Sequence, residues 1–348
     1  MISRSPRPPH RAARPTTVAG PLVGLMLAAL LAGCAIGSPG AADEAEGSGT
    51  APAEASAYPL TVDNCGTDVT FEAPPERVVT VKSSTLELML ALGLEDRVVG
   101  AAFSDGPVPS AYADAAAGLE TISDKVPSRE ATLALEPDLV FAGWESNFSA
   151  EGVGERAELE RLGVHTYVAP AACKAAGYMP DPLTFDEVFR EFDEAGAIFG
   201  VPDASAELVA EQRAALDAIE PSTAGLRALW YSSGEDTPYV GAGIGAPQMI
   251  MAAAGLSNIA AEVRDTWTSM SWEAIVAAEP DVIVLVDAVW NTAESKIAHL
   301  ESNAATAQLP AVQQGRYVIV DFPATEAGVR NVDAVASVVD QLAALESR

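Results

Sequence analysis

The sequence predicts an α/β protein with two Rossmann-like lobes, each built on a mainly parallel sheet and joined by a long helical spine. The main observation is a repeat, because the pattern S-x-E-A-x-x-A-x-E-P-D begins at Ser128 and again at Ser271. In each copy a Ser N-cap opens a short helix, Pro ends it, and an apolar strand follows. Strands alternate with helices around both copies, which is typical of parallel sheets. The length of 348 residues also exceeds one typical domain.

Residues 1–33 are typical of a signal peptide. A region with four Arg and no acidic residue precedes an apolar stretch, 18–31, that is short for a transmembrane helix. The stretch ends in L-A-G-C at Cys34, which resembles a bacterial lipobox with cleavage before Cys34 and lipidation of its thiol. The alternative is an ordinary signal peptide beside a chance Cys. We expect an extracytoplasmic protein, anchored to the cell membrane by the lipid on Cys34.

Residues 34–57 are predicted to be a flexible tether. Almost all are Ala, Gly, Ser, Pro, Asp or Glu, a composition that cannot form a core. A flexible chain of this length spans on the order of 26 Å. After residue 33 the chain carries 16 basic and 49 acidic residues. So acidic a surface excludes a nucleic-acid partner and leaves the lipid as the expected membrane contact.

The rest of the chain is predicted to form a first lobe over 58–183, an interlobe helical spine over 184–221 and a second lobe over 222–348. Apolar runs predict strands in the first lobe at 77–81, 98–102, 139–141 and 164–168, with a helix at 84–92. In the second lobe they predict strands at 226–231, 282–286 and 317–320, with helices at 247–254 and 331–345. In the spine, Phe residues repeat at helical spacing from Phe185 to Phe199, and a second helix follows Pro202. We interpret the Phe stripe as core packing.

Taken together, these features resemble the substrate-binding lipoproteins of ABC importers that carry ferric siderophores, haem and cobalamin. The residues that carry the resemblance are the strand opening with R-V-V at Arg77, the helix E-L-M-L-A-L-G ending at Gly93, and the two E-x6-P-D units. The resemblance covers 58–348. It implies a monomer that captures a small molecule between two lobes and delivers it to an ABC permease and its ATPase, with no catalytic residues and no cofactor.

Several stretches resemble one actinobacterial branch of that family. They are Lys82-Ser83-Ser84 and the segments 143–147, 178–182 and 322–330. That branch has been proposed to bind a precursor of the deazaflavin coenzyme F-420. The resemblance places this precursor ahead of a ferric siderophore as the expected ligand.

Glu130 and Glu273 are the expected permease contacts. In the family, one Glu on each lobe docks into Arg pockets of the permease, and these two residues match those positions. The chemistry agrees, because a Glu in the first turn of a helix is electrostatically favoured there and a carboxylate suits bidentate binding by Arg. The alternative is a pair of ordinary acids at helix starts.

The expected ligand site lies beyond the carboxyl ends of the strands. Lys82, Ser83 and Ser84 follow the first strand and open a helix, so a cation, hydroxyls and N–H groups converge on a seat for an anion. Three aromatic residues at strand ends offer flat faces for a planar ligand: Trp144, Tyr231 and Trp290. Several basic residues are further candidates: Arg330, with Lys174, Arg264 and Lys296 as weaker ones. A solvated Lys and aromatic residues used only for packing are the alternatives.

Other motifs point to structure rather than chemistry. Cys65 and Cys173 are an even pair in an exported protein, which favours a disulfide over two separate thiols. His165 and His299 are isolated, so we expect no metal site. The glycines of 241–246 have the spacing G-x-G-x-G and follow no clear strand, which indicates a flexible loop rather than a dinucleotide site.

Two other classes of protein remain as alternatives. An exported lipoprotein enzyme, such as a hydrolase, is disfavoured because the sequence contains no G-x-S-x-G motif and no evident nucleophile–base pair. A surface receptor that signals without transport is the other alternative, and neighbouring permease and ATPase genes would argue against it.

Overall fold

The computed structural model describes residues 57–347. The predicted signal peptide, the lipidation site Cys34 and nearly all of the predicted tether lie outside the described residues. Within the part of the chain that is described, no helix is both long enough and apolar enough to cross a membrane.

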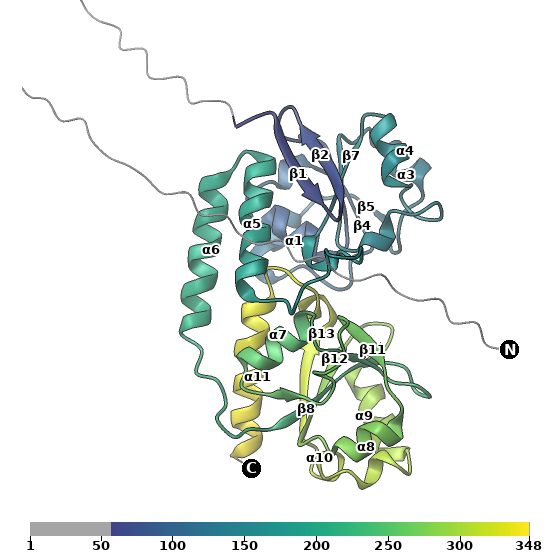
Figure 1. Cartoon of the computed structure of the whole chain (residues 1–348), viewed down its shortest axis with the longest axis vertical. Coiled ribbons are helices and arrows are strands. Elements are labelled where there is room, and N and C mark those ends of the chain that lie inside the picture. Colours follow the sequence, from purple (N-terminus) through teal and green to yellow (C-terminus); the bar gives the residue numbers. More distant parts are fainter. Residues whose placement is uncertain (1–56, 348) are drawn as a thin grey trace, which may run out of the picture. The chain divides into compact units, whose positions relative to one another are not determined.

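The first lobe is built on a five-stranded parallel sheet (Figure 1). Its strands, in the order β5-β4-β3-β6-β7, are β5 (Thr121–Ser123), β4 (Val98–Ala102), β3 (Val78–Val81), β6 (Leu139–Ala142) and β7 (His165–Val168). The central pair, β3 and β6, is wholly buried, as continuous apolar runs in a parallel sheet predict. The helices are α1 (Ser83–Ala91), α2 (Ala113–Ala116), α3 (Arg129–Leu133) and α4 (Arg156–Arg161). The strand order reverses at β3, which is the switch point where ligands bind in such sheets.

A hairpin that the sequence pattern did not reveal precedes this sheet. Its strands β1 (Leu60–Asn64) and β2 (Thr67–Phe71) pair antiparallel. The Asn64 side chain exchanges hydrogen bonds of 2.8 Å with both backbone groups of Val168, at the end of β7. A disulfide joins Cys65, in the hairpin turn, to Cys173, with their Cα atoms 5.3 Å apart. The hairpin is therefore attached to the strand end that leads into the interlobe region.

The second lobe has a mixed sheet in the order β11-β9-β8-β12-β13. The strands β8 (Arg227–Ser233), β10 (Ser257–Asn258), β12 (Val282–Asp287) and β13 (Tyr317–Asp321) pair in parallel. Strand β9 (Tyr239–Gly241) pairs antiparallel with β8 and with β11 (Trp267–Ser269). These two short antiparallel strands were not predicted. The helices are α7 (Ala246–Ala253), α8 (Trp272–Ala278), α9 (Ala293–Ser302), α10 (Pro310–Gln313) and α11 (Asn331–Glu346).

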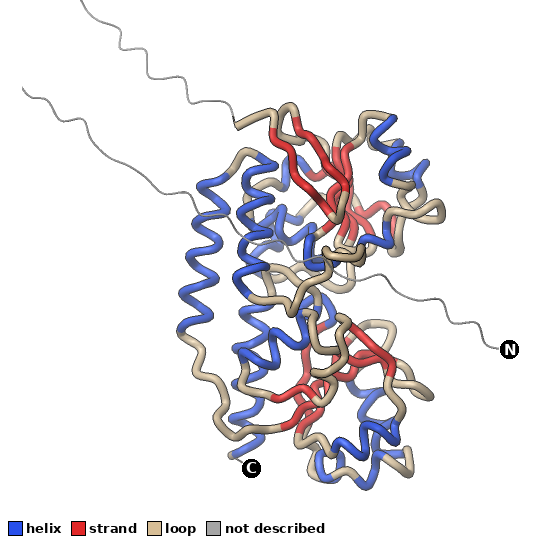
Figure 2. Tube along the Cα trace, viewed as in Figure 1, coloured by secondary structure: helices blue, strands red, loops and turns tan. Residues whose placement is uncertain are grey.

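The spine is a pair of helices, which confirms the second helix expected after Pro202. Helix α5 (Phe185–Phe199) ends at Gly200, whose φ of 70° favours glycine, and Pro202 starts α6 (Pro202–Asp217). The Phe stripe of α5 is buried in the core of the first lobe, which confirms its interpretation as packing. Figure 2 shows α5, α6 and α11 along one side of the two groups of strands.

The repeated motif has the same structure in both lobes. Ser128 and Ser271 each accept a hydrogen bond of 3.2 Å from the backbone N–H three residues later, which confirms both as N-caps of α3 and α8. The Asp of each E-P-D unit accepts from a backbone N–H at the start of the neighbouring strand. The Asp138 carboxylate accepts a hydrogen bond from Arg77 N at 3.0 Å, and the Asp281 carboxylate accepts one from Arg227 N at 2.8 Å. The motif thus fixes the entry to the central strand of each lobe.

Candidate ligand-binding site

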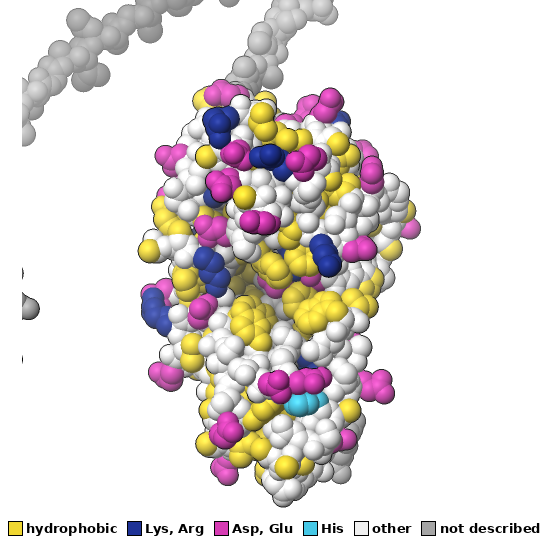
Figure 3. Space-filling model, turned by 90° about the vertical axis from the view of Figure 1, so that its right-hand side faces the viewer, with side chains coloured by type: hydrophobic (Ala, Val, Ile, Leu, Met, Phe, Trp, Pro, Cys, Tyr) yellow, Lys and Arg dark blue, Asp and Glu magenta, His cyan; other side chains and the backbone are white. Residues whose placement is uncertain are grey.

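A cavity of about 420 Å³ lies between the lobes. The first lobe contributes residues that follow β3, β6 and β7, and the second contributes residues at or after the ends of β8, β12 and β13, together with β9 and β11. These are mostly the carboxyl ends of parallel strands, where α/β sheets bind ligands. Figure 3 shows hydrophobic side chains gathered around a hollow in this region. The site is a cleft shared by two lobes.

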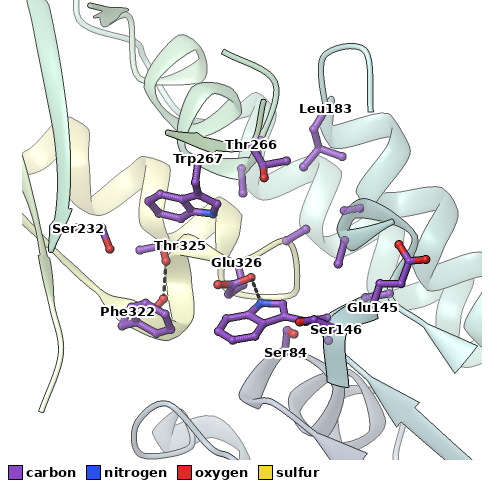
Figure 4. Close-up of a pocket in the computed structure, with 18 of the residues that line it drawn as sticks. Ser84, Glu145, Ser146, Leu183, Ser232, Thr266, Trp267, Phe322, Thr325 and Glu326 are labelled. Carbon is purple, nitrogen blue, oxygen red and sulfur yellow. Dashed lines mark hydrogen bonds between the residues drawn. The ribbon is translucent and has the colours of Figure 1, made fainter. Parts of the chain in front are cut away.

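The cavity wall is rich in aromatic rings. Trp144 comes from the first lobe, whereas Trp267, Trp290, Phe322 and Tyr239 come from the second. Tyr239 and Trp267 are stacked, with centroids 5.8 Å apart and planes at 14°. Trp290 meets Phe322 edge to face at 5.4 Å and is 59% exposed, so it lies at the mouth. Figure 4 shows the Trp267 indole, Phe322 and Glu326 around the same space. Such a wall suits a flat, apolar-faced molecule.

Glu326 brings a carboxyl group into this aromatic wall. Its Oε2 accepts a hydrogen bond of 2.9 Å from Trp144 Nε1, a contact between the two lobes that Figure 4 shows. Burial raises the pKa of Glu326, while the nearby Lys82 charge and then the Trp144 N–H lower it in part. The carboxyl group therefore holds a proton to higher pH than an ordinary Glu.

Lys174 is the one basic residue among the described residues that line the cavity. Its Nζ donates to Asp265 Oδ1 at 3.0 Å and to Thr266 Oγ1 at 2.6 Å, so it too links the lobes. Its backbone N–H donates to Glu145 Oε2 at 2.5 Å. Since Glu145 and Glu326 also line the cavity, the charged lining contains two acids and one base.

Lys82 does not reach the cavity, which corrects its predicted contact with an acidic ligand group. Its side chain is 0% exposed and its Nζ pairs with Asp105. The Nζ atom lies 3.6 Å from the ring centroid of Trp144, with Phe103 and Phe322 within 5.0 Å. Burial lowers the Lys82 pKa, and the charges of Glu326 and then Asp105 raise it in part. The Lys82 ammonium group therefore makes a cation–π contact with the Trp144 ring from the side away from the cavity.

The other predicted ligand contacts divide into two groups. Ser84, Trp144 and Trp290 line the cavity. Ser83 and Tyr231 lie outside it, because Ser83 Oγ accepts from Asp105 N at 2.8 Å, and Tyr231 is buried with its hydroxyl on Gly234 O. Both side chains are used to build their own lobe.

Arg330 also lies outside the cavity lining. Its guanidinium donates to both carboxylate oxygens of Glu87 on α1, at 2.7 and 2.5 Å, and to Pro107 O at 2.7 Å. Both side chains of the pair are largely buried. Arg330 therefore ties the second lobe to the first. Two weaker candidates are also engaged within the protein. Lys296 Nζ donates to Val286 O and Asn291 O in its own lobe, whereas Arg264 pairs with Asp181 of the first lobe at 2.7 Å.

The cavity residues that the sequence did not predict include Tyr239, Trp267, Phe322 and Glu326. Phe322 and Glu326 follow β13, a predicted strand, so the rule that ligands lie beyond strand ends contained the information needed to find them. Tyr239 and Trp267 lie on the short antiparallel strands β9 and β11, which have no clear apolar alternation.

The glycine segment 241–246 differs from the expected flexible loop. Strand β9 precedes it and its residues are buried. At Gly243 an added Cβ would lie 2.0 Å from Ala261 O, so close backbone packing explains this glycine. Among the described residues, no group of three or more His, Cys, Asp or Glu side chains is arranged to hold a metal ion.

Glu130 and Glu273 occupy equivalent places on α3 and α8. Both side chains are exposed in the first helical turn. For each, its own backbone N–H and then the N-cap Ser hydroxyl lower the pKa, so both are ionised at neutral pH. Figure 1 shows α3 and α8 on different lobes but on the same side of the molecule, the side that faces the viewer in Figure 3.

Comparison with known proteins decides the family. Residues 78–324 match the family described as Periplasmic binding protein. The chain belongs to this family. It is 26% identical over 334 residues to an uncharacterised ABC transporter substrate-binding lipoprotein, YvrC, of Bacillus subtilis, covering 91% of this chain and 94% of that one. It is 30% identical to a cobalamin-binding protein of Halobacterium salinarum, over 66% of this chain and 59% of that one.

Solved structures of periplasmic binding proteins share its two-lobed architecture. One from Veillonella parvula superposes with a TM-score of 0.72 at 26% identity, covering 81% of this chain and 97% of that one. A structure titled as an ABC-type Fe3+-hydroxamate transport system, from Saccharomonospora viridis, has a TM-score of 0.70 at 26% identity, covering 82% and 99%. The family member described here is thus similar to substrate-binding proteins of ABC transporters.

Proposed function

We propose that this protein is the extracytoplasmic, lipid-anchored substrate-binding component of an ABC importer. The observation that carries the proposal is the aromatic cavity shared by two lobes, in a chain of the periplasmic binding protein family. A ligand held there touches both lobes at once, so its binding energy favours the closed arrangement. The closed, loaded protein then delivers the ligand to a permease and its ATPase.

The proposed ligand is small and planar, with an acidic group directed toward Lys174. A volume of about 420 Å³ lies in the lower part of the usual range for small-molecule sites. It therefore suits a deazaflavin precursor of coenzyme F-420 better than the much larger cobalamin. A ferric siderophore is the second candidate, favoured by the likeness to the Fe3+-hydroxamate system. Resemblance to the actinobacterial branch keeps the deazaflavin first.

Glu130 and Glu273 are the proposed docking residues. They are exposed, ionised and equivalent in the two lobes, so a permease with one Arg pocket per lobe would bind both carboxylates. Because neither residue lines the cavity, docking and ligand capture use separate groups.

Isothermal titration calorimetry with four ligands tests the proposal: the phosphorylated deazaflavin precursor, a ferric hydroxamate, haem and cobalamin. We expect submicromolar binding of the deazaflavin, weakened about tenfold in Trp144→Ala and in Trp267→Ala, because each loses one stacking face. Tight binding of the ferric hydroxamate without the deazaflavin would reverse the order of candidates. Binding of none of the four would contradict the proposed function.

A further inference from the structure

The two oxygens of the Glu326 carboxyl group differ in their hydrogen bonding. Oε2 accepts the hydrogen bond from Trp144 Nε1 at 2.9 Å. Oε1 has no hydrogen-bond partner among residues 57–347. Because Glu326 lines the cavity, this acceptor is presented to whatever fills the space. Figure 4 shows the Glu326 carboxyl group and the Trp267 indole facing the same space.

The direction of this carboxyl group is fixed from both sides. On its own lobe, the backbone carbonyl of Glu326 accepts from Asn331 Nδ2 at 2.7 Å, and Thr325 Oγ1 donates to Phe322 O at 2.7 Å. On the other lobe, Trp144 rests on the buried Nζ of Lys82, 3.6 Å from its ring centroid. The group is therefore preorganised in the closed cleft rather than free to turn toward solvent.

Shape and hydrogen bonding together restrict the ligand. A flat ring inserted beside the indoles presents its faces to Trp144 and Trp267 and its edge to Glu326. A carboxylate oxygen accepts hydrogen bonds, and one kept from water without a donor costs free energy. The ligand therefore has to supply a donor at its edge. An anionic group is disfavoured at this position because it would meet a like charge.

We propose that Glu326 selects the ligand by its edge: the ligand is a flat conjugated heterocycle with a ring N–H that donates to Oε1. The inference rests on the proposed function and deepens it. It assigns different tasks to Glu326 and Lys174, which both line the cavity. Glu326 binds the N–H edge of the ring between the indoles, and Lys174, at the boundary with Asp265 and Thr266, binds the acidic group.

A matched pair of probes tests the inference on the full-length protein. The probes are 5-deazariboflavin, which has a ring imide N–H, and its N3-methyl derivative, which has none. We expect calorimetry to show that the methylated probe binds at least tenfold more weakly to the wild type, since it loses the hydrogen bond and leaves Oε1 without a donor.

The variant Glu326→Gln gives a second, independent reading. Its amide oxygen accepts from Trp144 Nε1, so its NH2 group faces the cavity and opposes the ring N–H. We expect 5-deazariboflavin to bind about ten- to a hundredfold more weakly, with the preference over the methylated probe lost. Glu207→Gln, at an exposed position on α6, is the control and keeps wild-type affinity. Thermal unfolding checks that both variants fold. The comparison of the two probes uses only the wild-type protein, so it does not depend on the folding of either variant.

The outcomes separate this inference from the proposed function. Equal binding of both probes, or unchanged binding in Glu326→Gln, contradicts the edge contact and leaves the transport role intact. Binding of a ferric hydroxamate, haem or cobalamin but neither deazaflavin probe also contradicts the inference alone. Failure of every one of these ligands to bind the wild type contradicts both.

Discussion

Two buried side chains of opposite charge lie directly beneath the ligand cavity. Lys82 and Asp105 pair there, enclosed by the rings of Phe103, Trp144 and Phe322. Lys82 has φ of 90°, a conformation that costs free energy in a residue with a side chain. Oδ2 of Asp105 is buried without a hydrogen-bond partner among the described residues. This arrangement costs folding free energy, and it holds the Trp144 ring in place through the contact with Lys82 Nζ. Lys82 is therefore a positioning residue.

We predict that Lys82→Met destabilises the protein by about 3 kcal/mol or more, because it leaves Asp105 buried without a counter-charge. Adding Asp105→Asn should recover much of that loss, since the second substitution removes the unpaired charge. Urea denaturation of the two variants and the wild type measures both effects. If Lys82→Met were as stable as the wild type, the two charges would not be coupled.

Glu191, on α5, is a second buried acid. It is 5% exposed, its Oε2 has no hydrogen-bond partner in the described part of the chain, and burial raises its pKa to about 8. Between about pH 4.5 and 8 the unfolded chain releases this proton while the folded chain keeps it. The folded state then binds more protons than the unfolded state, so stability falls as pH rises through this window.

We therefore expect Glu191→Gln to stabilise the protein relative to the wild type at pH 8 more than at pH 5, by up to a few kcal/mol. Urea denaturation at both pH values gives the difference. Asp193→Asn, at an exposed position on the same helix, is the control. The same pH dependence in Glu191→Gln and the wild type would refute the assignment.

At the scale of elements, the duplicated helices α3 and α8 present equivalent acids. Each has the same Ser N-cap and the same exposed Glu, at the same place relative to the strand that follows. Two short helices on different lobes can therefore contact one partner at two points. The distance between these points depends on how far the lobes are closed.

We predict that Glu130→Arg combined with Glu273→Arg abolishes uptake of the ligand but leaves its affinity unchanged. The substituted charges would repel Arg pockets on the permease, whereas neither residue touches the cavity. Uptake into cells and calorimetry on the purified protein measure the two effects. The pair Glu220→Arg and Glu346→Arg makes the same charge change at exposed sites away from α3 and α8 and should transport normally. Wild-type uptake by the first double variant would contradict the docking role.

For the whole molecule, polar contacts join the two lobes. Arg330 and Glu87 form a bidentate pair, Lys174 reaches Asp265 and Thr266, and Trp144 reaches Glu326. Each contact joins residues far apart in the sequence. These contacts join the two lobes around the ligand cavity.

We expect Arg330→Ala to open the cleft, since it leaves the Glu87 carboxylate buried without its partner, a change that costs about 3–5 kcal/mol in buried pairs. Small-angle X-ray scattering should show a larger radius of gyration for the free variant, and ligand affinity should fall. Glu87→Gln combined with Arg330→Met removes both charges and should lose less stability. An unchanged scattering curve and affinity for Arg330→Ala would show that the pair does not maintain closure.

The two-lobed architecture could be predicted from the sequence, because the patterns that indicate it are local. Ser caps, Pro stops and apolar runs act within a few residues, so the repeats at Ser128 and Ser271 predicted matching helix–strand units and the places where strands end. Trp144 and Trp290 were found as cavity residues by that rule. The hairpin β1–β2 and the strands β9 and β11 were not predicted, because their residues lack clear alternation and are held by tertiary contacts.

Which charges face the ligand depends on packing between distant parts of the chain. Lys82 and Arg330 were reasonable anion-binding residues from their positions in the chain, yet each is neutralised by a carboxylate that the fold brings from elsewhere, Asp105 or Glu87. Glu326 became prominent because Trp144, on the other lobe, occupies one of its oxygens and leaves the other toward the cavity. A buried charge requires a partner, and the partner is chosen by packing between distant segments, about which local sequence patterns carry no information.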